Sequence, residues 1–265
     1  MSAATDSLRY ERCDATALIT FNRPAVRNAF TLAMFDQLAA LIDAAAHDAT
    51  VRVIVLTGAG GAFSAGIDLA EQERLLTDLS IRTARQHLTQ MQAVTRQLLA
   101  LPKPVIAAIN GVAVGVGAEL AIASDIRLAA EGALFQFAEV RRGLFETNGV
   151  MYLLPRIVGH GRALEWLLTG DKIPAPSALA AGLVTHIESE ETLLSFALEM
   201  AARLAVNAPI SMRLVKQVMT RTYDLDRDSV MQLEVDGMLE CLGSDDLREG
   251  LRAFAEKRTP EYCGR

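Results

Sequence analysis

Two patterns of apolar residues take turns along most of the chain: short continuous runs, and residues that recur at intervals of three or four. Short runs rich in β-branched residues predict buried strands at residues 51–56 (VRVIVL), 105–109 and 125–129. Residues 8–21 predict two further strands around a turn at Cys13. Because helices are predicted between these strands, the order indicates an α/β protein with largely parallel strand pairing.

Helices are predicted where apolar residues recur at intervals of three or four. Thr31 is predicted to cap a helix whose apolar face consists of Leu32, Phe35, Leu38 and Ile42. Further helices are predicted over residues 80–100 and, rich in small residues, from about Val116. The last part of the chain predicts only helices, over 191–206, 208–222, 225–242 and 245–256. We therefore expect a βα core over residues 1–195 and a C-terminal helical region over 196–265.

The most apolar segment, residues 104–123 (PVIAAINGVAVGVGAELAIA), is about long enough to span a bilayer. It contains Asn110, Glu119 and three glycines, and a β-branched part is followed by a part rich in small residues. This composition favours a buried strand that leads into a buried helix, so no membrane span is expected.

Composition and charge narrow the possible partners. Hydrophobic residues make up 51% of the chain and charged residues 22%, which is typical of a globular protein. The formal net charge of −6 argues against nucleic acid or an anionic membrane as the main partner. Cys13, Cys241 and Cys263 form neither a disulfide framework nor a zinc pattern, and residues 1–15 lack the apolar run of a signal peptide. We therefore expect a cytoplasmic protein.

The glycine-rich run TGAGGAFSAG after the strand at 51–56 matches no common phosphate or nucleophile motif. It lacks the lysine of a phosphate-binding loop, and Phe63 stands where the dinucleotide pattern counted from Gly58 requires glycine. The segment around Ser64 lacks the first glycine of the serine-hydrolase elbow. None of the four histidines belongs to a metal-binding pattern, so no metal is expected.

Two turns rich in small residues follow predicted buried strands, at residues 62–69 (AFSAGIDL) and 110–120 (NGVAVGVGAEL). Small residues let a ligand approach the backbone, and free N–H groups at a helix start favour negative charge. The two turns could therefore aim two N–H groups at one oxygen, as in an oxyanion hole. The alternative, which spacing alone favours, is that the glycines only permit tight packing of two layers.

The order and spacing of these motifs resemble the crotonase (enoyl-CoA hydratase/isomerase) superfamily, over nearly the whole chain. The matching segments are residues 22–24, 27–29, 56–58, 62–69, 107–120, 124–127, 135–143, 154–159, 178–184 and 254–258. The resemblance implies a ββα superhelix core with two sheets. It also implies C-terminal helices that form homotrimers, which commonly pair into hexamers.

The resemblance assigns the two oxyanion-hole N–H groups to Ile67 and Val116, and the two acid/base carboxyls to Glu119 and Glu139. Two N–H donors stabilise the enolate-like transition state of a thioester, each by about 3–4 kcal/mol. Hydration also requires one group that deprotonates water and one that protonates the α-carbon. Two glutamates can do this if burial and mutual repulsion keep one protonated near neutral pH. Without the resemblance, we would interpret Glu119 as a helix-start carboxylate and Glu139 as a surface acid.

The resemblance also implies that the ligand is an acyl thioester of coenzyme A, with no further cofactor. It places coenzyme A along the first turn and, at the nucleotide end, near residues that often come from a neighbouring subunit. The matching positions are Arg27, Ala65, Gly66 and Asp68 in the first group, and Phe254 and Lys257 in the second. Because the phosphates need only a few local cations, this ligand is compatible with an acidic chain.

Three departures from the family pattern leave the acyl specificity open. Val116 replaces the usual glycine of the second turn, so its side chain must point away from the acyl site or narrow it. Ala138 stands where the family commonly has proline, and residues 145–148 (FETN) replace a Pro-Gly turn that lines the acyl pocket. Glu146 is expected to be an exposed loop acid; the alternative is a third carboxylate near the substrate.

The leading hypothesis is an enzyme that hydrates the 2,3 double bond of a trans-2-enoyl-CoA. A delta-isomerase would use the same oxyanion hole and can work with one glutamate. A non-catalytic acyl-CoA-binding subunit would need neither Glu119 nor Glu139. The acidic charge balance gives no support to an RNA-binding role.

Overall fold

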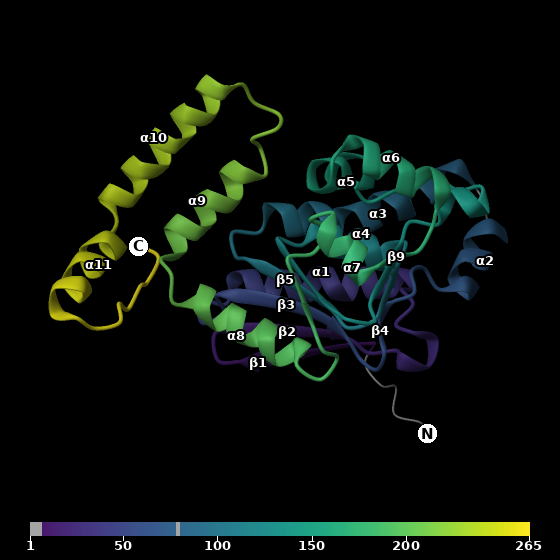
Figure 1. Cartoon of the computed structure of the whole chain (residues 1–265), viewed down its shortest axis with the longest axis horizontal. Coiled ribbons are helices and arrows are strands. Elements are labelled where there is room, and N and C mark those ends of the chain that lie inside the picture. The colour runs from purple at the N-terminus through teal and green to yellow at the C-terminus, as the bar shows by residue number, and fades with distance from the viewer. Residues whose placement is uncertain (1–6, 78–79) are drawn as a thin grey trace.

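The computed structural model of the chain describes residues 7–77 and 80–265 (Figure 1). Residues 1–6 and 78–79 lie outside the described residues. The expectation that residues 1–15 contain no signal peptide therefore falls partly outside them. Within the described ranges the longer strands form a six-stranded sheet in the order β1-β2-β3-β5-β7-β10. These strands are β1 (Leu8–Cys13), β2 (Thr16–Phe21), β3 (Val53–Gly58), β5 (Val105–Ile109), β7 (Ile126–Ala130) and β10 (His186–Glu188).

A second, four-stranded sheet lies beside the first. Its order is β4-β6-β8-β9, with β4 (Ala62–Ser64), β6 (Val112–Val114), β8 (Leu134–Gln136) and β9 (Ile173–Pro174). Three times along the chain, a strand of the large sheet is followed by a strand of the small sheet and then by a helix. The pairs of strands are β3 with β4, β5 with β6, and β7 with β8. This repeated step produces the ββα superhelix that the resemblance implied.

The strands of the large sheet are parallel except for the antiparallel pair β1 and β2. The register pairs Ile54 of β3 with Val105 of β5, and every residue of β5 is buried. Continuous apolar runs are typical of parallel strands because helices cover both faces of such a sheet. The runs at 51–56 and 105–109 therefore predicted these strands correctly.

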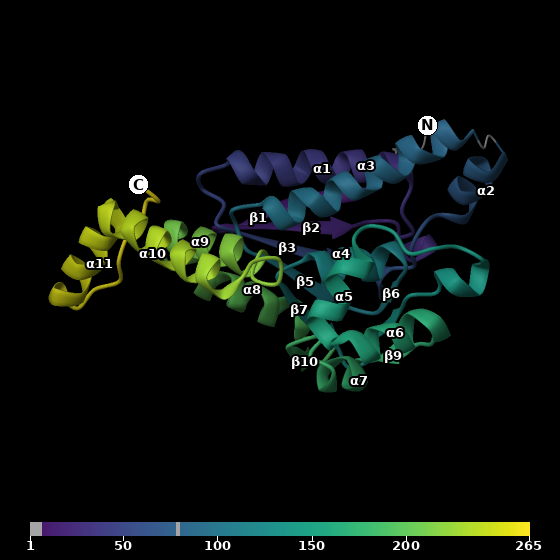
Figure 2. The ribbon, with the colours of Figure 1, turned by 90° about the horizontal axis from the view of Figure 1, so that it is seen from above.

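Helices cover this core. Buried side chains of α1 belong to the main hydrophobic cluster, and α1 and α3 pack against each other (Figure 2). Helix α8 packs against β2, β3, β5 and β7. The helices of the core are α1 (Leu32–His47), α2 (Leu69–Thr77), α3 (Ile81–Ala100), α4 (Val116–Ala123), α5 (Val150–Val158), α6 (His160–Thr169), α7 (Ala175–Ala180) and α8 (Leu193–Ala205).

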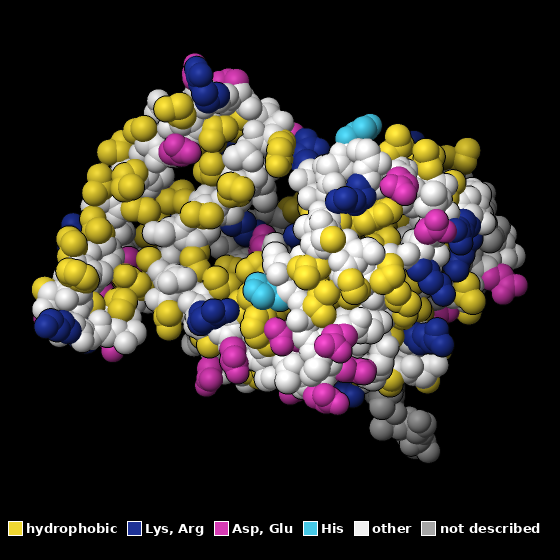
Figure 3. All heavy atoms as spheres, viewed as in Figure 1, with side chains coloured by type: hydrophobic (Ala, Val, Ile, Leu, Met, Phe, Trp, Pro, Cys, Tyr) yellow, Lys and Arg dark blue, Asp and Glu magenta, His cyan; other side chains and the backbone are white. Residues whose placement is uncertain are grey.

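The remaining helices, α9 (Pro209–Met219), α10 (Arg227–Gly243) and α11 (Asp245–Glu256), extend away from the core as an arm. Helix α10 has no buried residue, and apolar side chains are spread over the arm (Figure 3). The predicted division at residue 195 falls inside α8, which lies on the sheet, whereas α9 to α11 form the arm. The two-domain division stays a prediction.

Most predicted helices are present with small changes of their ends. Thr31 caps α1 by accepting a hydrogen bond from the N–H of Met34 (3.4 Å). The apolar segment 104–123 forms β5, β6 and α4, whose residues are mostly buried, as the sequence predicted. Within residues 7–77 and 80–265, no single helix has the length and apolar composition to cross a membrane. Only α8 and α9 together pass that test, and they are bent by 109° at their junction.

Candidate active site

The two small-residue turns predicted from the sequence lie against each other. A Cβ atom on Gly117 would lie 2.5 Å from the carbonyl oxygen of Ser64, and one on Gly66 would lie 2.9 Å from that of Val114. Gly66 also has a φ of +96°, a conformation that side chains rarely adopt. The glycines therefore do permit tight packing, and the first turn lies directly against the second.

Each turn has one backbone N–H group without an acceptor in its own ladder or helix. Phe30 pairs with Ile67 as in a parallel ladder: the Phe30 N–H donates to Gly66 O (2.7 Å), and the Asp68 N–H donates to Phe30 O (2.8 Å). In such a ladder the N–H of the central residue, Ile67, points away from the paired strand. Val116 is the first residue of α4, so its N–H has no acceptor within the helix.

A cavity of about 840 Å³ adjoins both turns. All four residues predicted to carry the chemistry line it: Ile67, Val116, Glu119 and Glu139. Val116 is 5% exposed and lines this cavity. Whether its side chain points away from an acyl site or narrows it stays a prediction. Other parts of the wall are apolar side chains, including Leu32, Leu88, Met91, Leu144 and Phe145.

Glu119 is almost completely buried on α4 and is held by two donors. Thr147 Oγ1 donates to Glu119 Oε1 (3.1 Å), and Asn148 Nδ2 donates to Glu119 Oε2 (2.5 Å). Asn148 has a left-handed φ of +48°, which asparagine tolerates better than most residues. Sequence reasoning named the FETN segment only as a departure and missed these two contacts.

Glu139 lies at the start of a short 3-10 helix, η2 (Glu139–Arg142), after β8. Its Oε1 lies against the second turn, because a Cβ on Gly115 would be only 2.7 Å from that oxygen. Its Oε2 is buried without a hydrogen-bond partner among the described residues. The glycine at 115 therefore leaves the space that the Glu139 carboxyl occupies.

Glu146 was expected to be an exposed loop acid, and this expectation was wrong. The side chain is 7% exposed, and both of its carboxyl oxygens are buried without a hydrogen-bond partner in the described part of the chain. One oxygen from each of Glu119, Glu139 and Glu146 lies within 4.8 Å of the others. Glu146 thus belongs to the buried part of the loop between η2 and the start of α5 at Val150.

Burial and proximity change the acidity of this cluster. Burial raises the pKa of Glu119 to about 7; the hydrogen bond from Asn148 acts against this rise, and the negative charge of Glu139 adds to it. Burial, followed by the closeness of the Glu139 carboxyl, raises the pKa of Glu146 to about 9. Protons are thus held near neutral pH at a site where ordinary carboxyls would be ionised.

The same three carboxyls could supply oxygen ligands to a cation. Mg²⁺ and Ca²⁺ take about six or more oxygen ligands, however, and this cluster offers one oxygen from each of three residues. The raised pKa values of Glu119 and Glu146 favour protons over a cation at neutral pH.

The residues predicted to hold coenzyme A near the first turn do lie together. The N–H of Ala65 donates to the carbonyl of Arg27 (2.9 Å), whose side chain is exposed, and Gly66 follows in the turn. Asp68 has a structural partner as well, since Arg23 forms an ion pair with its Oδ2 (2.8 Å). The sequence motif around Arg23 thus ties the first loop to α2.

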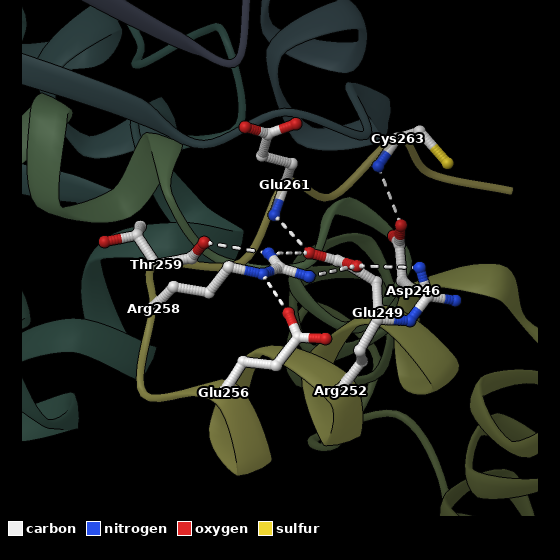
Figure 4. A network of polar contacts seen from close by, with 8 residues as sticks. All are labelled: Asp246, Glu249, Arg252, Glu256, Arg258, Thr259, Glu261 and Cys263. Atoms are coloured by element: carbon white, nitrogen blue, oxygen red, sulfur yellow. Dashed lines mark hydrogen bonds and ion pairs between the residues drawn. The ribbon is translucent and has the colours of Figure 1, made fainter.

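Phe254 and Lys257 lie on the other side of the molecule. They belong to the end of α11, and Figure 1 shows α11 at the opposite end from α2, which lines the cavity. Phe254 is 86% exposed. The segment that follows is held by Arg258, which binds Glu249 and Glu256 (Figure 4). Within one chain, therefore, these two residues do not meet the rest of the predicted site.

Comparison with known proteins places this geometry in a family. The model of the family described as enoyl-CoA hydratase/isomerase matches residues 11–265. The chain is 34% identical over 263 residues to a crotonyl-CoA hydratase of Syntrophomonas wolfei, covering 99% of this chain and 100% of that protein. It is 37% identical over 251 residues to a 1,2-epoxyphenylacetyl-CoA isomerase of Escherichia coli, covering 93% and 94%.

A solved structure agrees with the sequence relatives. The crystal structure of an enoyl-CoA hydratase from Bacillus anthracis superposes with a TM-score of 0.93 at 34% identity, covering 98% of this chain and 100% of that one. The match to this family covers residues 11–265, so it includes both packed turns and the glutamates. The chain belongs to the enoyl-CoA hydratase/isomerase family, the crotonase superfamily.

Proposed function

We propose that this protein is an enoyl-CoA hydratase that adds water across the 2,3 double bond of a trans-2-enoyl-CoA. The observation that carries the proposal is the convergence of Ile67, Val116, Glu119 and Glu139 on one cavity. A binding subunit would need the cavity and the N–H groups, but it would not need two carboxyls on the cavity wall, one of them buried with a pKa of about 7.

The reaction follows from these groups. The thioester oxygen accepts hydrogen bonds from the N–H groups of Ile67 and Val116, which stabilise the negative charge that develops there. One glutamate takes a proton from water while the water oxygen bonds to the β-carbon and the π electrons move towards the thioester. The other glutamate then gives its proton to the α-carbon. No electron leaves the system, and the reaction requires no cofactor beyond the substrate.

Glu119 suits such an exchange. Its pKa of about 7 means that both the acid and the carboxylate are populated near neutral pH, which is the range where proton transfer is most efficient. Thr147 and Asn148 fix the direction of its carboxyl. The cavity beyond the glutamates is lined largely by apolar side chains, which fits an acyl chain.

An isomerase remains the second candidate, because a relative named as an isomerase is 37% identical to this chain. Isomerisation moves a proton between two carbons of the substrate and adds no water. The presence of two carboxyls on the cavity favours hydration, since water must be both held and deprotonated.

We also propose that the active protein is a homotrimer or a hexamer of this chain. The arm exposes a series of apolar side chains, a feature typical of surfaces that bind another protein. They include Val215, Met219, Tyr223, Met231, Val235, Met238, Leu242 and Phe254. In such an assembly a second copy would bring Phe254 and Lys257 to the coenzyme A of its neighbour, joining Arg27, Ala65, Gly66 and Asp68.

The test is a paired assay of the purified protein with crotonyl-CoA and with a 3-enoyl-CoA. The proposal predicts conversion of crotonyl-CoA to 3-hydroxybutyryl-CoA, with slower or no isomerisation of the 3-enoyl-CoA. Faster isomerisation would favour the second candidate. No turnover of either substrate by the wild-type protein would contradict both catalytic proposals. Light scattering of the same sample tests the trimer, and a monomer would contradict the assembly.

A further inference from the structure

The buried carboxyl of Glu146 has no role in the mechanism proposed above. Its two oxygens, together with Glu139 Oε2, are buried and lack a hydrogen-bond partner among the described residues. A buried carboxylate without donors is strongly destabilising, whereas a protonated carboxyl beside a carboxylate pairs one oxygen of each group through one proton. A third carboxyl beside Glu119 and Glu139 is therefore unfavourable unless it carries a proton.

The position of Glu146 relative to the cavity indicates how it acts. Its neighbours Phe145 and Thr147 line the cavity, but Glu146 is not one of the described lining residues. Glu139, in contrast, does line the cavity, and an oxygen of Glu146 lies within 4.8 Å of it. Glu146 is therefore placed to act on the substrate through its neighbour Glu139, which does line the cavity.

We propose that Glu146 is a positioning residue that keeps its proton and shares it with the Glu139 carboxylate, fixing the direction and the charge of that catalytic acid. The inference rests on the proposed hydration. A donor at Glu139 Oε2 leaves the other oxygen, Oε1, beside Gly115 at the second turn, where the substrate is polarised. The bonded proton also prevents three negative charges from meeting in one buried space.

The groups around this cluster support a shared proton. Glu119 faces it from α4 and Glu139 from η2, while His87 of α3 and Glu71 and Glu73 of α2 line the same cavity. Among the described lining residues there is no lysine or arginine that would stabilise a third carboxylate. The raised pKa of Glu146 has the same origin, with burial as the first cause and Glu139 as the second.

The first experiment distinguishes two properties of Glu146: its hydrogen-bond donor and its ability to ionise. The Glu146→Gln variant keeps the size of the side chain and an N–H donor for Glu139, but it cannot titrate. We expect its kcat near neutral pH to fall no more than about fivefold, with KM unchanged. Wild-type kcat should decline as the pH rises past the raised pKa of Glu146, and the decline should be absent in Glu146→Gln.

The Glu146→Leu variant removes the donor as well, and we expect its kcat to fall by about 10–100-fold at nearly constant KM. The matched control is Glu165→Gln, which neutralises an exposed glutamate on α6 and should behave as the wild type. Wild-type kcat in Glu146→Leu would overturn the proposal. So would an alkaline decline in Glu146→Gln equal to that of the wild type.

The second experiment does not depend on activity, so it remains decisive if the hydration proposal fails. Infrared spectra of protein with ¹³C-labelled glutamate are recorded at a pH of about 8, which lies between the raised pKa values of Glu119 and Glu146. We expect a protonated-carboxyl band in the wild type and in Glu165→Gln, and its loss in Glu146→Gln. Absence of the band in the wild type would overturn the inference. Its removal by added Mg²⁺ or Ca²⁺ would also overturn it, because the cluster would then hold a cation in place of the proton.

Discussion

The substitution Glu119→Gln should make the folded protein more stable at alkaline pH while it removes one of the two proposed catalytic carboxyls. Glu119 is 1% exposed, and burial raises its pKa from an ordinary 4.5 to about 7. A carboxyl with a raised pKa contributes stability while it is protonated. That contribution is complete below pH 4.5 and is lost as the pH rises through about 7.

The size of this loss follows from the two pKa values. Each pH unit between them corresponds to about 1.4 kcal/mol, so ionisation of Glu119 should cost the wild type about 3 kcal/mol by a pH of about 8. Glutamine avoids this cost, because Asn148 can turn its amide to offer Oδ1 to the new N–H. Unfolding entropy of about 2.1 cal/mol/K per residue converts the difference to roughly 5 °C in Tm for this chain length.

Thermal unfolding of both proteins across pH 5 to 8, in small steps and at equal concentration, is the assay. At the acidic end the two Tm values should agree, and the variant should gain steadily towards the alkaline end, by about 5 °C in all. Glu165→Gln, on the exposed side of α6, is the control for loss of one charge and should show no such trend. A variant that is equally less stable than the wild type at every pH would refute the reasoning, since the buried acid would then carry no ionisation cost.

Three further substitutions test other parts of the account. Gly115→Ala would place a Cβ 2.7 Å from Glu139 Oε1, at a φ of +49° that strains a side chain. The kcat for hydration should therefore fall at least about tenfold while coenzyme A affinity is retained. An unchanged kcat would argue against the placement of Glu139. Lys216→Met would leave the partly buried carboxylate of Asp125, now 2.8 Å from Lys216 Nζ, without its ion-pair partner. Urea unfolding should show a loss of no more than about 3 kcal/mol, which a second substitution, Asp125→Asn, largely restores; equal stability of the single variant and the wild type would be contrary to this. Lys257→Ala should weaken coenzyme A binding in calorimetry without changing the acyl step, and equal affinity would exclude Lys257 from the site.

The long elements were predictable because burial leaves a strong pattern in the sequence. Strand β5 has a continuous apolar run, and helices α9 and α11 have apolar residues at intervals of three or four, as such elements require. The three-residue strands β4 and β6 were interpreted as turns, because so short a strand has too few positions to show a period of two. Helix α2 was not predicted at all; its mean composition is polar, and it packs at the rim of the cavity.

The candidate site was predictable where a motif fixes the backbone and not where the chain folds back. Glycines at 66 and 117 mark the turns, since no side chain fits there, and the family resemblance then assigned the two N–H groups to the neighbouring Ile67 and Val116. The contacts of Thr147 and Asn148 with Glu119 join residues almost thirty positions apart, which no local pattern reveals. The burial of Glu146 was missed for the same reason, because an acid in a loop is usually exposed.

The central claim is that two glutamates on one cavity hydrate an enoyl-CoA, and the direct test is the rate of crotonyl-CoA hydration by Glu119→Gln and by Glu139→Gln. Each substitution removes a proton donor or acceptor, which typically contributes about 10²–10⁴-fold to the rate. The account predicts a loss of kcat of that size in both variants, with a folded protein and little change in coenzyme A affinity. Hydration at the wild-type rate by either variant would contradict it.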